Sequence, residues 1–439
     1  LIFCLYAKKV VSLCAFYMIV QRMIDLKVIR TIRKENATVA ENYVFMTVLQ
    51  ALNMCFYLLV YPFLIRVLGV DSYGLYVYAA AVVALFVTFV SFGYDLPAAK
   101  RIAENVGDKN AMSQILSEVT TSKLLLEVFA MIVYFGLFLL LPKMQANPIL
   151  FVIVFFQTIT NIFFPQWYFQ GVQRMRVVTY IQVAFKVLSL PFLFLFLHDA
   201  KDNWVYALIV TITAIAGGVV AWLIIIYKDG IKVRLVSLSA IQVSIRNALP
   251  FFLSNTTGVI KEQGVVLLIG QFLGMNDVAI YDLANKIILI PRTLFSKLND
   301  ALFPKMMAQQ NESRRRKILI GEIVIGLASI ALIAIFGYWA VLLLGGASMM
   351  SSYAVSVILS VTILTWLVVG ALIYFYIIPS GKAFYITVNQ LVALLTTFVF
   401  AGVGLFFTHS VYLLAVSLAL SGLIEILFCS IVVRYKLKL

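Results

Sequence analysis

Charged residues are scarce in this sequence: Asp, Glu, Lys and Arg make up 12% of the 439 residues, where about 25% is usual in a soluble domain. Histidine occurs only as His198 and His409, and the four cysteines show neither metal-ligand nor redox spacing. We therefore expect no metal site and no histidine-based catalytic dyad. The cysteines are interpreted as small apolar residues.

Apolar residues take the place of the missing charge. They account for 63% of the chain and give it a mean hydropathy of +1.03, which is more apolar surface than a globular core of this length can cover. They occur in unbroken runs of about 20 residues, the length with which a helix crosses hydrocarbon. A transmembrane β-barrel would instead show strands of alternating residues. The sequence predicts an all-α integral membrane protein.

We expect about twelve transmembrane helices from residue 43 onward, joined by short loops. Residues 1–42 are expected to form an N-terminal extension and a cytoplasmic amphipathic segment. Translation is expected to begin near Met23, with an extra helix over residues 1–22 as the alternative. The predicted spans are 43–65, 74–96, 118–141, 148–168, 177–197, 204–227, 249–272, 279–302, 318–344, 352–378, 382–407 and 410–433.

Lysine and arginine are distributed unevenly between the two sets of loops. Three of them, Arg66, Lys143 and Lys201, fall on one side, against 22 on the other. The positive-inside rule places the richer side in the cytoplasm, together with both termini. The net charge of +15 then reflects topology, so nucleic-acid binding is not expected. The richer side holds Lys27, Arg30, Arg33, Lys34, Lys100, Arg101, Lys109, Arg174, Arg176, Lys228, Lys232, Arg234, Arg246, Lys305, Arg314, Arg315, Arg316, Lys317, Lys382, Arg434, Lys436 and Lys438.

An internal repeat relates the two halves of the chain. Residues 68–76 and 273–281 both begin with Leu-Gly and carry a Tyr seven residues after the Gly, at an offset of 205. The same offset relates Asp95 to Asp300. With six spans in each half, the repeats share one orientation in the membrane and are parallel. The expected parts are an N-lobe over 43–227 (helices 1–6), a cytoplasmic linker over 228–248 and a C-lobe over 249–439 (helices 7–12).

Several charged residues fall inside the predicted spans, where each costs roughly 2.5–3.5 kcal/mol on insertion scales. Such residues usually face a bundle interior or a wet cavity, and structural ion pairs or interfacial anchoring are the alternative explanations. Lys123 and Glu127 have the i,i+4 spacing of a local pair, and Lys186 and Glu425 are further charges inside spans. The candidate substrate-binding residues are Arg66, Lys261, Lys286 and Arg292, and the candidates for ion coupling or for lining a cavity are Asp95, Glu262, Asp282 and Asp300.

Three segments resemble those of a known family. Residues 62–69 (PFLIRVLG), followed by 73–76 (YGLY), resemble the first helix–loop signature of bacterial polysaccharide-unit (O-antigen type) flippases, which belong to the multidrug/oligosaccharidyl-lipid/polysaccharide exporter superfamily. Residues 165–171 (PQWYFQG) resemble the helix 4 segment of the family, and 303–305 (FPK) are similar too. The aromatic stretch that includes 165–171 is expected either at the headgroup level or as a ledge for a lipid or sugar.

The resemblance implies two six-helix lobes around a central cavity lined by helices 1, 2, 7 and 8. It implies a flippase that moves an oligosaccharide repeat unit on undecaprenyl pyrophosphate from the cytoplasmic to the periplasmic leaflet of the bacterial inner membrane, for O-antigen, capsule or exopolysaccharide assembly. Alternating access by rocking of the lobes needs no enzyme activity and no cofactor, although H⁺ or Na⁺ could be coupled. The implied partners are the lipid-linked oligosaccharide and membrane lipid, with the downstream polymerase as a further candidate.

Two other functions are kept as alternatives. A multidrug or small-solute exporter of the same superfamily would share the architecture, although a cavity rich in cations disfavours cationic drugs. A membrane polysaccharide polymerase or glycosyltransferase usually carries a large outer loop with catalytic acids or histidines, for which the short outer loops leave no room.

Overall fold

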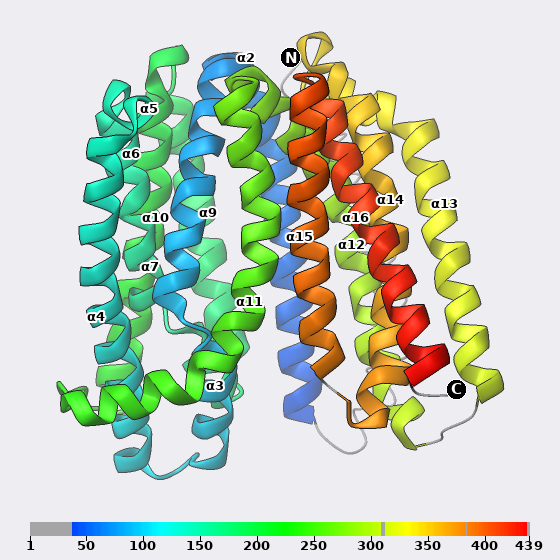
Figure 1. The fold of residues 1–439 in the computed structure, drawn as a ribbon. Coiled ribbons are helices and arrows are strands. Elements are labelled where there is room, and N and C mark those ends of the chain that lie inside the picture. Colours follow the sequence, from blue (N-terminus) through cyan, green and yellow to red (C-terminus); the bar gives the residue numbers. More distant parts are fainter. Residues whose placement is uncertain (1–36, 309–311, 383, 437–439) are drawn as a thin grey trace. The chain divides into compact units, whose positions relative to one another are not determined.

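The computed structural model describes residues 37–308, 312–382 and 384–436 (Figure 1). Within these ranges the regular secondary structure is helical and no strand occurs. The expected all-α fold is confirmed. The amphipathic segment over 24–35 and the expected translation start near Met23 lie outside the described residues.

The helices follow one another with short connections. In chain order they are α2 (Ala37–Ser91), α3 (Asp95–Glu104), α4 (Lys109–Leu140), α5 (Pro142–Ala146), α6 (Pro148–Phe155), α7 (Gln157–Phe163), α8 (Gln166–Gly171), α9 (Met175–Phe196), η1 (Ala200–Asp202), α10 (Asn203–Leu223), η2 (Ile224–Lys228), α11 (Leu238–Phe272), α12 (Met275–Ala308), α13 (Glu312–Leu344), η3 (Ala347–Met349), α14 (Ser351–Leu372), η4 (Ile373–Ile377), η5 (Ile378–Ser380), α15 (Phe384–Phe407), α16 (Val411–Ile431) and η6 (Val432–Lys436).

Nine segments of the described residues are long and apolar enough to cross a membrane. One of them, Val44–Glu104, contains two spans in series, because α2 is interrupted at Gly69. Helices α11 and α12, with 35 and 34 residues, are long enough as well but more polar, since α11 carries the adjacent charges Lys261 and Glu262. The second span within Val44–Glu104 and the two helices α11 and α12 raise the number from nine to twelve segments of membrane-spanning length in the described chain. This agrees with the expected number.

The two Leu-Gly sequences of the repeat both mark a break between helices. Gly69 has φ +75° and Gly274 has φ +131°, backbone conformations that residues with a Cβ rarely adopt. Each break lets the chain leave one long helix and enter the next. The repeat seen in the sequence is thus matched by a repeat in local backbone structure.

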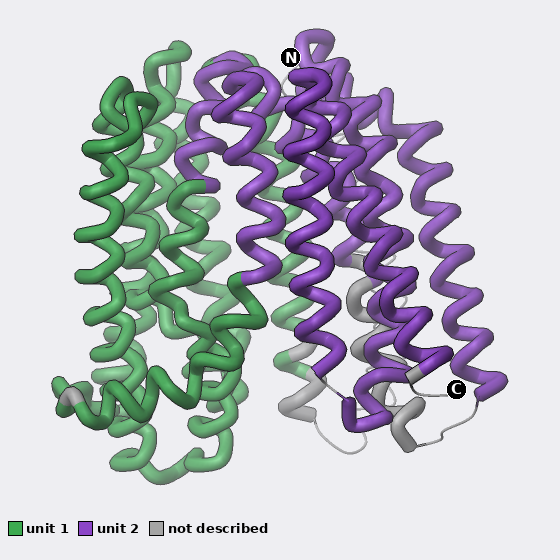
Figure 2. The backbone as a smooth tube through the Cα atoms, in the orientation of Figure 1, with its two compact units in different colours: residues 1–68, 82–256 green, residues 69–81, 257–439 purple. Residues whose placement is uncertain are grey.

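The contacts between residues divide the chain into two compact units (Figure 2). Unit 1 comprises the described residues up to Leu68 and Val82–Thr256, and unit 2 comprises Gly69–Ala81 and Thr257–Leu439. The part of α2 just after Gly69 therefore packs with the second half of the chain. A Cβ added at Gly74 would lie 1.9 Å from the carbonyl oxygen of Met275, so the two backbones nearly touch there. The expected lobes, with a linker over 228–248, stay a prediction.

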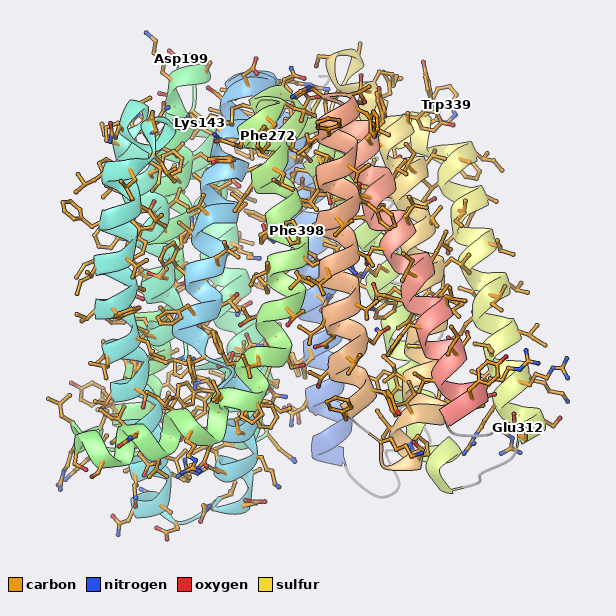
Figure 3. The ribbon with its side chains drawn as sticks, in the orientation of Figure 1. Lys143, Asp199, Phe272, Glu312, Trp339 and Phe398 are labelled. Carbon is orange, nitrogen blue, oxygen red and sulfur yellow. The ribbon has the colours of Figure 1, made fainter. Side chains whose placement is uncertain are left out.

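Loops of unit 1 alternate between its two ends. Lys143, after α4, and Asp199, after α9, lie at the same end of this unit (Figure 3). Helix α3 lies at the other end (Figure 1). This is the alternation that a chain of consecutive spans requires. Within unit 2, Glu312 and Trp339 mark opposite ends of α13 (Figure 3).

The aromatic segment before α9 is a core element of unit 1. Trp167, Tyr168 and Phe169 are 3%, 0% and 0% exposed, and a Cβ added at Gly171 would lie 2.7 Å from the carbonyl oxygen of Ala99 in α3. The Tyr168 hydroxyl donates to Asp229 at 2.9 Å. Trp167, Tyr168 and Phe169 therefore form neither an aromatic belt nor a ledge for a ligand, because they are buried in the core of unit 1.

Candidate functional site in unit 2

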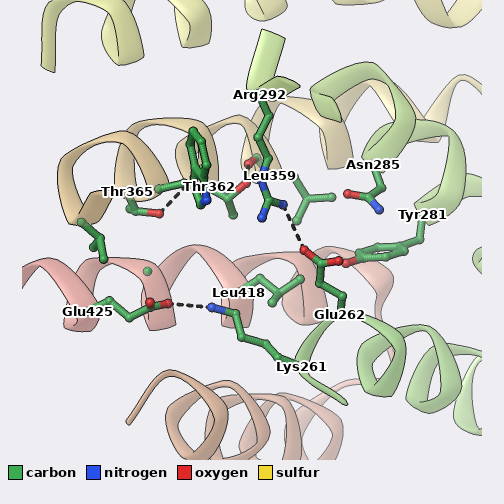
Figure 4. Close-up of a pocket in the computed structure, with 13 residues that line it drawn as sticks. Lys261, Glu262, Tyr281, Asn285, Arg292, Leu359, Thr362, Thr365, Leu418 and Glu425 are labelled. Carbon is green, nitrogen blue, oxygen red and sulfur yellow. Dashed lines mark hydrogen bonds and ion pairs between the residues drawn. The ribbon is translucent and has the colours of Figure 1, made fainter. Parts of the chain in front are cut away.

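A cavity of about 110 Å³ lies inside unit 2 among α11, α12, α14 and α16 (Figure 4). It is unusually polar for the interior of membrane-spanning helices. Its charged and polar lining comprises Lys261, Glu262, Tyr281, Asn285, Arg292, Thr362, Thr365 and Glu425, and Trp366 adds an aromatic wall. At about 30 Å³ for each water molecule, the space fits a few waters, an ion or one small anionic group.

Lys261 crosses the cavity from α11 to reach Glu425 on α16, as Figure 4 shows. Its Nζ donates to Glu425 Oε1 at 2.6 Å. The other carboxylate oxygen accepts a hydrogen bond from Asn389 of α15 at 3.2 Å, and the Cys429 thiol donates to the Asn389 side-chain oxygen at 3.3 Å. The ion pair is thus the first part of a polar chain that links three helices.

Arg292 and Glu262 form the second ion pair of the cavity. Arg292 Nη1 on α12 lies 3.1 Å from Glu262 Oε1 on α11, and its guanidinium lies 5.7 Å from the centre of the Trp366 ring, within cation–π range. Glu262 directly follows Lys261. Because successive residues of a helix point about 100° apart, Lys261 contacts α16 whereas Glu262 contacts α12.

The two pairs make the cavity electrically balanced. Each cation has one carboxylate, so the ion pairs offset part of the cost of removing four charges from water. An anion entering the cavity must compete with Glu425 and Glu262 for Lys261 and Arg292. Lys261 is 23% exposed and Arg292 33% exposed, so neither is sealed from an incoming ligand.

The structure brings some of the predicted site residues together. Lys261, Glu262 and Arg292 line the same cavity. Lys286 and Asp282 do not belong to its lining; they lie 3.9 Å apart on α12, one turn from each other. The Tyr73 hydroxyl donates to Asp282 at 2.9 Å, so this pair is held by the segment that follows the Gly69 break.

The remaining predicted residues lie outside this cavity. Asp95 begins α3 in unit 1, where the N-terminal end of a helix favours a carboxylate, and it lies 3.0 Å from the Lys123 ammonium. The expected Lys123–Glu127 pair is wrong. Glu127 shares a 2.5 Å hydrogen bond with Thr158, while Lys123, only 2% exposed, is neutralised by Asp95.

Arg66 and Asp300 are placed only in part. Arg66 lies in the portion of α2 that belongs to unit 1. Asp300 lies in α12, but its side chain is outside the described part of the chain. Their roles stay predictions.

Several residues at this site were not among the predicted site residues: Glu425, Trp366, Tyr281, Asn285, Thr362 and Thr365 line the cavity, and Asn389 lies outside its lining and donates to Glu425. Glu425 was noted only as a lone charge in an apolar span, and that isolation was the available signal. Asn389 and Trp366 give no such signal, because a single amide or ring in an apolar span is common. Only the packing of α14, α15 and α16 makes them neighbours of the charges.

The sequence of this chain matches a known protein family, and the chain belongs to it. Residues 39–310, more than half of the chain, match the family described as polysaccharide biosynthesis protein. A putative O-antigen transporter of Escherichia coli K12 is 25% identical over 309 residues, which are 70% of this chain and 74% of the relative. A putative O-antigen transporter of Shigella dysenteriae is 23% identical over 280 residues, 64% of this chain and 70% of the relative.

Solved structures share the fold. The lipid II flippase MurJ in an inward closed conformation superposes with a TM-score of 0.70 at 12% identity, over 90% of this chain and 88% of that one. An inward-facing multidrug resistance transporter of the MATE family, from the MOP superfamily, superposes with a TM-score of 0.64 at 14% identity, over 87% and 98%. The family match and these relatives confirm the resemblance to polysaccharide-unit transporters, the solved structures show the fold, and the chain is a multi-pass membrane protein.

Proposed function

We propose that this protein is a flippase for an oligosaccharide repeat unit carried on undecaprenyl pyrophosphate. It moves the unit from the cytoplasmic to the periplasmic leaflet of the bacterial inner membrane by alternating access. The observation that carries the proposal is the unit 2 cavity, in which Lys261 and Arg292 lie inside helices of membrane-spanning length. The family and the transporter names of the relatives support it over an enzyme.

The two cations suit a pyrophosphate. A lipid-linked pyrophosphate is strongly anionic and pays a large desolvation cost in a medium of low dielectric constant. Arg292 can offer a planar pair of N–H donors and Lys261 a compact charge, which together lower that cost. In this proposal Lys286 extends the site along α12, and Arg66 stays a further candidate for substrate binding.

The ion pairs supply a route to coupling. When the pyrophosphate takes Lys261 and Arg292, Glu425 and Glu262 lose their partners. A carboxylate left alone in a site of low dielectric constant is costly, so it takes up a proton or a cation such as Na⁺. Release of that ion on the other side returns the carboxylates to Lys261 and Arg292 and expels the anion.

The remaining assignments belong to the same proposal. Both termini lie in the cytoplasm, on the side that holds most loop lysines and arginines. The downstream polymerase is proposed to receive the flipped unit in the periplasmic leaflet.

The test is export of polysaccharide in a bacterial strain that lacks its own repeat-unit flippase. Lys261→Ala, Lys286→Ala and Arg292→Ala should each strongly reduce export per unit of protein in the membrane, because each loses a charged hydrogen bond of roughly 1.5–3 kcal/mol to the pyrophosphate. Lys317→Ala and Arg316→Ala, which alter exposed cations at the start of α13, are the matched controls. Full export by all three variants would reject this site.

A further inference from the structure

A second and larger cavity lies within unit 1 and has no part in the mechanism proposed above. Its volume is about 420 Å³, which falls in the range of roughly 300–1,000 Å³ typical of small-molecule sites. Residues of α2, α7, α9 and α10 line it. It is about four times larger than the unit 2 cavity of about 110 Å³, so it offers more room for a sugar ring.

Lys186 is the charged residue of this cavity. It lies near the middle of α9 (Met175–Phe196). Its Nζ donates to Asn53 Oδ1 at 2.5 Å and lies 5.6 Å from the centre of the Phe56 ring. Among the residues that the structure describes, no carboxylate lies within ion-pair distance of Lys186. Its partners are therefore neutral.

Lys186 differs from the cations of the unit 2 cavity in its partners. There, Lys261 and Arg292 each have a carboxylate. Lys186 has an amide oxygen and an aromatic ring, which orient the ammonium but leave its charge uncompensated. An unpaired charge near the centre of a spanning helix is costly and is usually retained for a function. A ligand that brings one negative charge would complete the site.

The other lining groups suit a sugar. Three rings, Phe56, Phe164 and Phe185, provide apolar faces against which a pyranose ring can lie. Asn161 and Gln182 provide side-chain amides. Within the described part of the chain each makes one hydrogen bond, to Val87 O at 3.3 Å and to Gln166 Oε1 at 3.4 Å, so donor and acceptor capacity remains for a ligand.

The hydroxyl groups of the lining are oriented as acceptors. Ser189 donates to its own helix at Lys186 O at 2.7 Å, and Thr213 donates to Ile209 O at 2.7 Å. Since each hydroxyl has a single proton but two lone pairs, the oxygen atoms can still accept from sugar hydroxyl groups. The cavity thus combines one cation, aromatic faces, amides and hydroxyl acceptors.

We propose that this unit 1 cavity binds an acidic sugar of the transported oligosaccharide, with the sugar carboxylate on Lys186. The inference rests on the proposed function and adds the class of sugar that is recognised. One unpaired lysine matches the single charge of a carboxylate better than the several charges of a pyrophosphate. The ring then packs on the phenylalanines, and its hydroxyl groups bond to Asn161, Gln182 and Ser189.

The test compares two probes that differ only at the acidic group, benzyl β-D-glucuronide and benzyl β-D-glucoside. Binding to the full-length protein in nanodiscs of neutral lipid is measured by titration calorimetry. The wild type should bind the glucuronide roughly tenfold more tightly, as one charged hydrogen bond predicts. Lys186→Met should abolish that preference and Lys186→Arg should retain much of it. Lys201→Met, which removes an exposed lysine of unit 1, should leave it unchanged.

The opposite results overturn the proposal. These are equal binding of both probes by the wild type, or a preference that survives in Lys186→Met. A photoreactive glucuronide keeps the test valid if that variant fails to fold: it should label the peptide over residues 181–189, and labelling confined to unit 2 overturns the site. Displacement of the glucuronide by phosphatidylglycerol would assign the cavity to a lipid headgroup instead, which also overturns it.

Failure of the proposed function gives a different pattern. A protein that prefers the glucuronide through Lys186 but does not support polysaccharide export would keep the site and reject the flippase. A protein that supports export but shows no preference would keep the flippase and reject the acidic-sugar site.

Discussion

Replacing Lys261 with methionine removes the ammonium group that lies 2.6 Å from Glu425 Oε1, while leaving a side chain of similar length. Among the described residues, Glu425 then keeps the Asn389 amide as its hydrogen-bond donor, at 3.2 Å from its other oxygen. Because the Glu425 side chain is 15% exposed, little water can replace the lost partner. We expect Lys261→Met to lower the free energy of unfolding through the stranded carboxylate rather than through lost packing.

The size of the effect follows from burial. Removing one member of a buried ion pair costs about 3–5 kcal/mol. The partial exposure of Lys261, 23%, and of Glu425 reduces this, so we expect about 2–3 kcal/mol. Removing both charges, with Glu425→Gln added to Lys261→Met, should restore most of the loss, because neither charge is then buried alone.

The assay is a double-mutant cycle. Unfolding of each purified protein in mixed micelles is monitored by circular dichroism. The four proteins of the cycle should give a coupling energy of about 1.5–3 kcal/mol between the two sites. Lys317→Met, at an exposed lysine, should change the free energy of unfolding by less than about 0.5 kcal/mol. If the losses of the two single variants simply add in the double variant, the contact contributes nothing and the reasoning is refuted.

Three further predictions can be checked separately. Reporter fusions at Lys438 and in the loop at Lys201 should report opposite sides of the membrane, and the same side for both would contradict the topology. Gly74→Ala should lower the free energy of unfolding by about 1–3 kcal/mol, because its Cβ would meet a backbone carbonyl oxygen at 1.9 Å; Gly258→Ala, with open space around it, should not. Arg292→Lys should restore less export than its charge alone predicts, because the planar pair of donors is lost; export equal to wild type would show that charge suffices.

The fold could be predicted from the sequence because its signal is local. Each apolar run needs only its own length to indicate a span, and the break at Gly69 is visible as a Leu-Gly repeated at Gly274. The membership of the segment after Gly69 in unit 2 could not be predicted. That assignment depends on contacts such as Gly74 with Met275, which bring together residues from distant parts of the chain.

The sequence predicted which charged residues lie in the candidate site, but it did not predict which of them form ion pairs. Helical periodicity shows that Lys261 and Glu262 face different directions, yet it does not say which helix each one meets. Glu425 is 164 residues from Lys261 in the sequence, and no local pattern joins them. For Lys123, the local rule gave the wrong partner, because Asp95, 28 residues upstream, lies closer in space than a neighbour on the same helix face.

The membership of Gly69–Ala81 in unit 2 has a consequence for biosynthesis. Tyr73 and its partner Asp282 are 209 residues apart in the chain. At roughly 5–20 residues per second on the ribosome, the early helix leaves the exit tunnel about 10–40 s before the helix that it must contact. Throughout that interval the nascent chain exposes a surface shaped for an absent neighbour. The length of that interval is set by the order of synthesis rather than by the strength of the final contact.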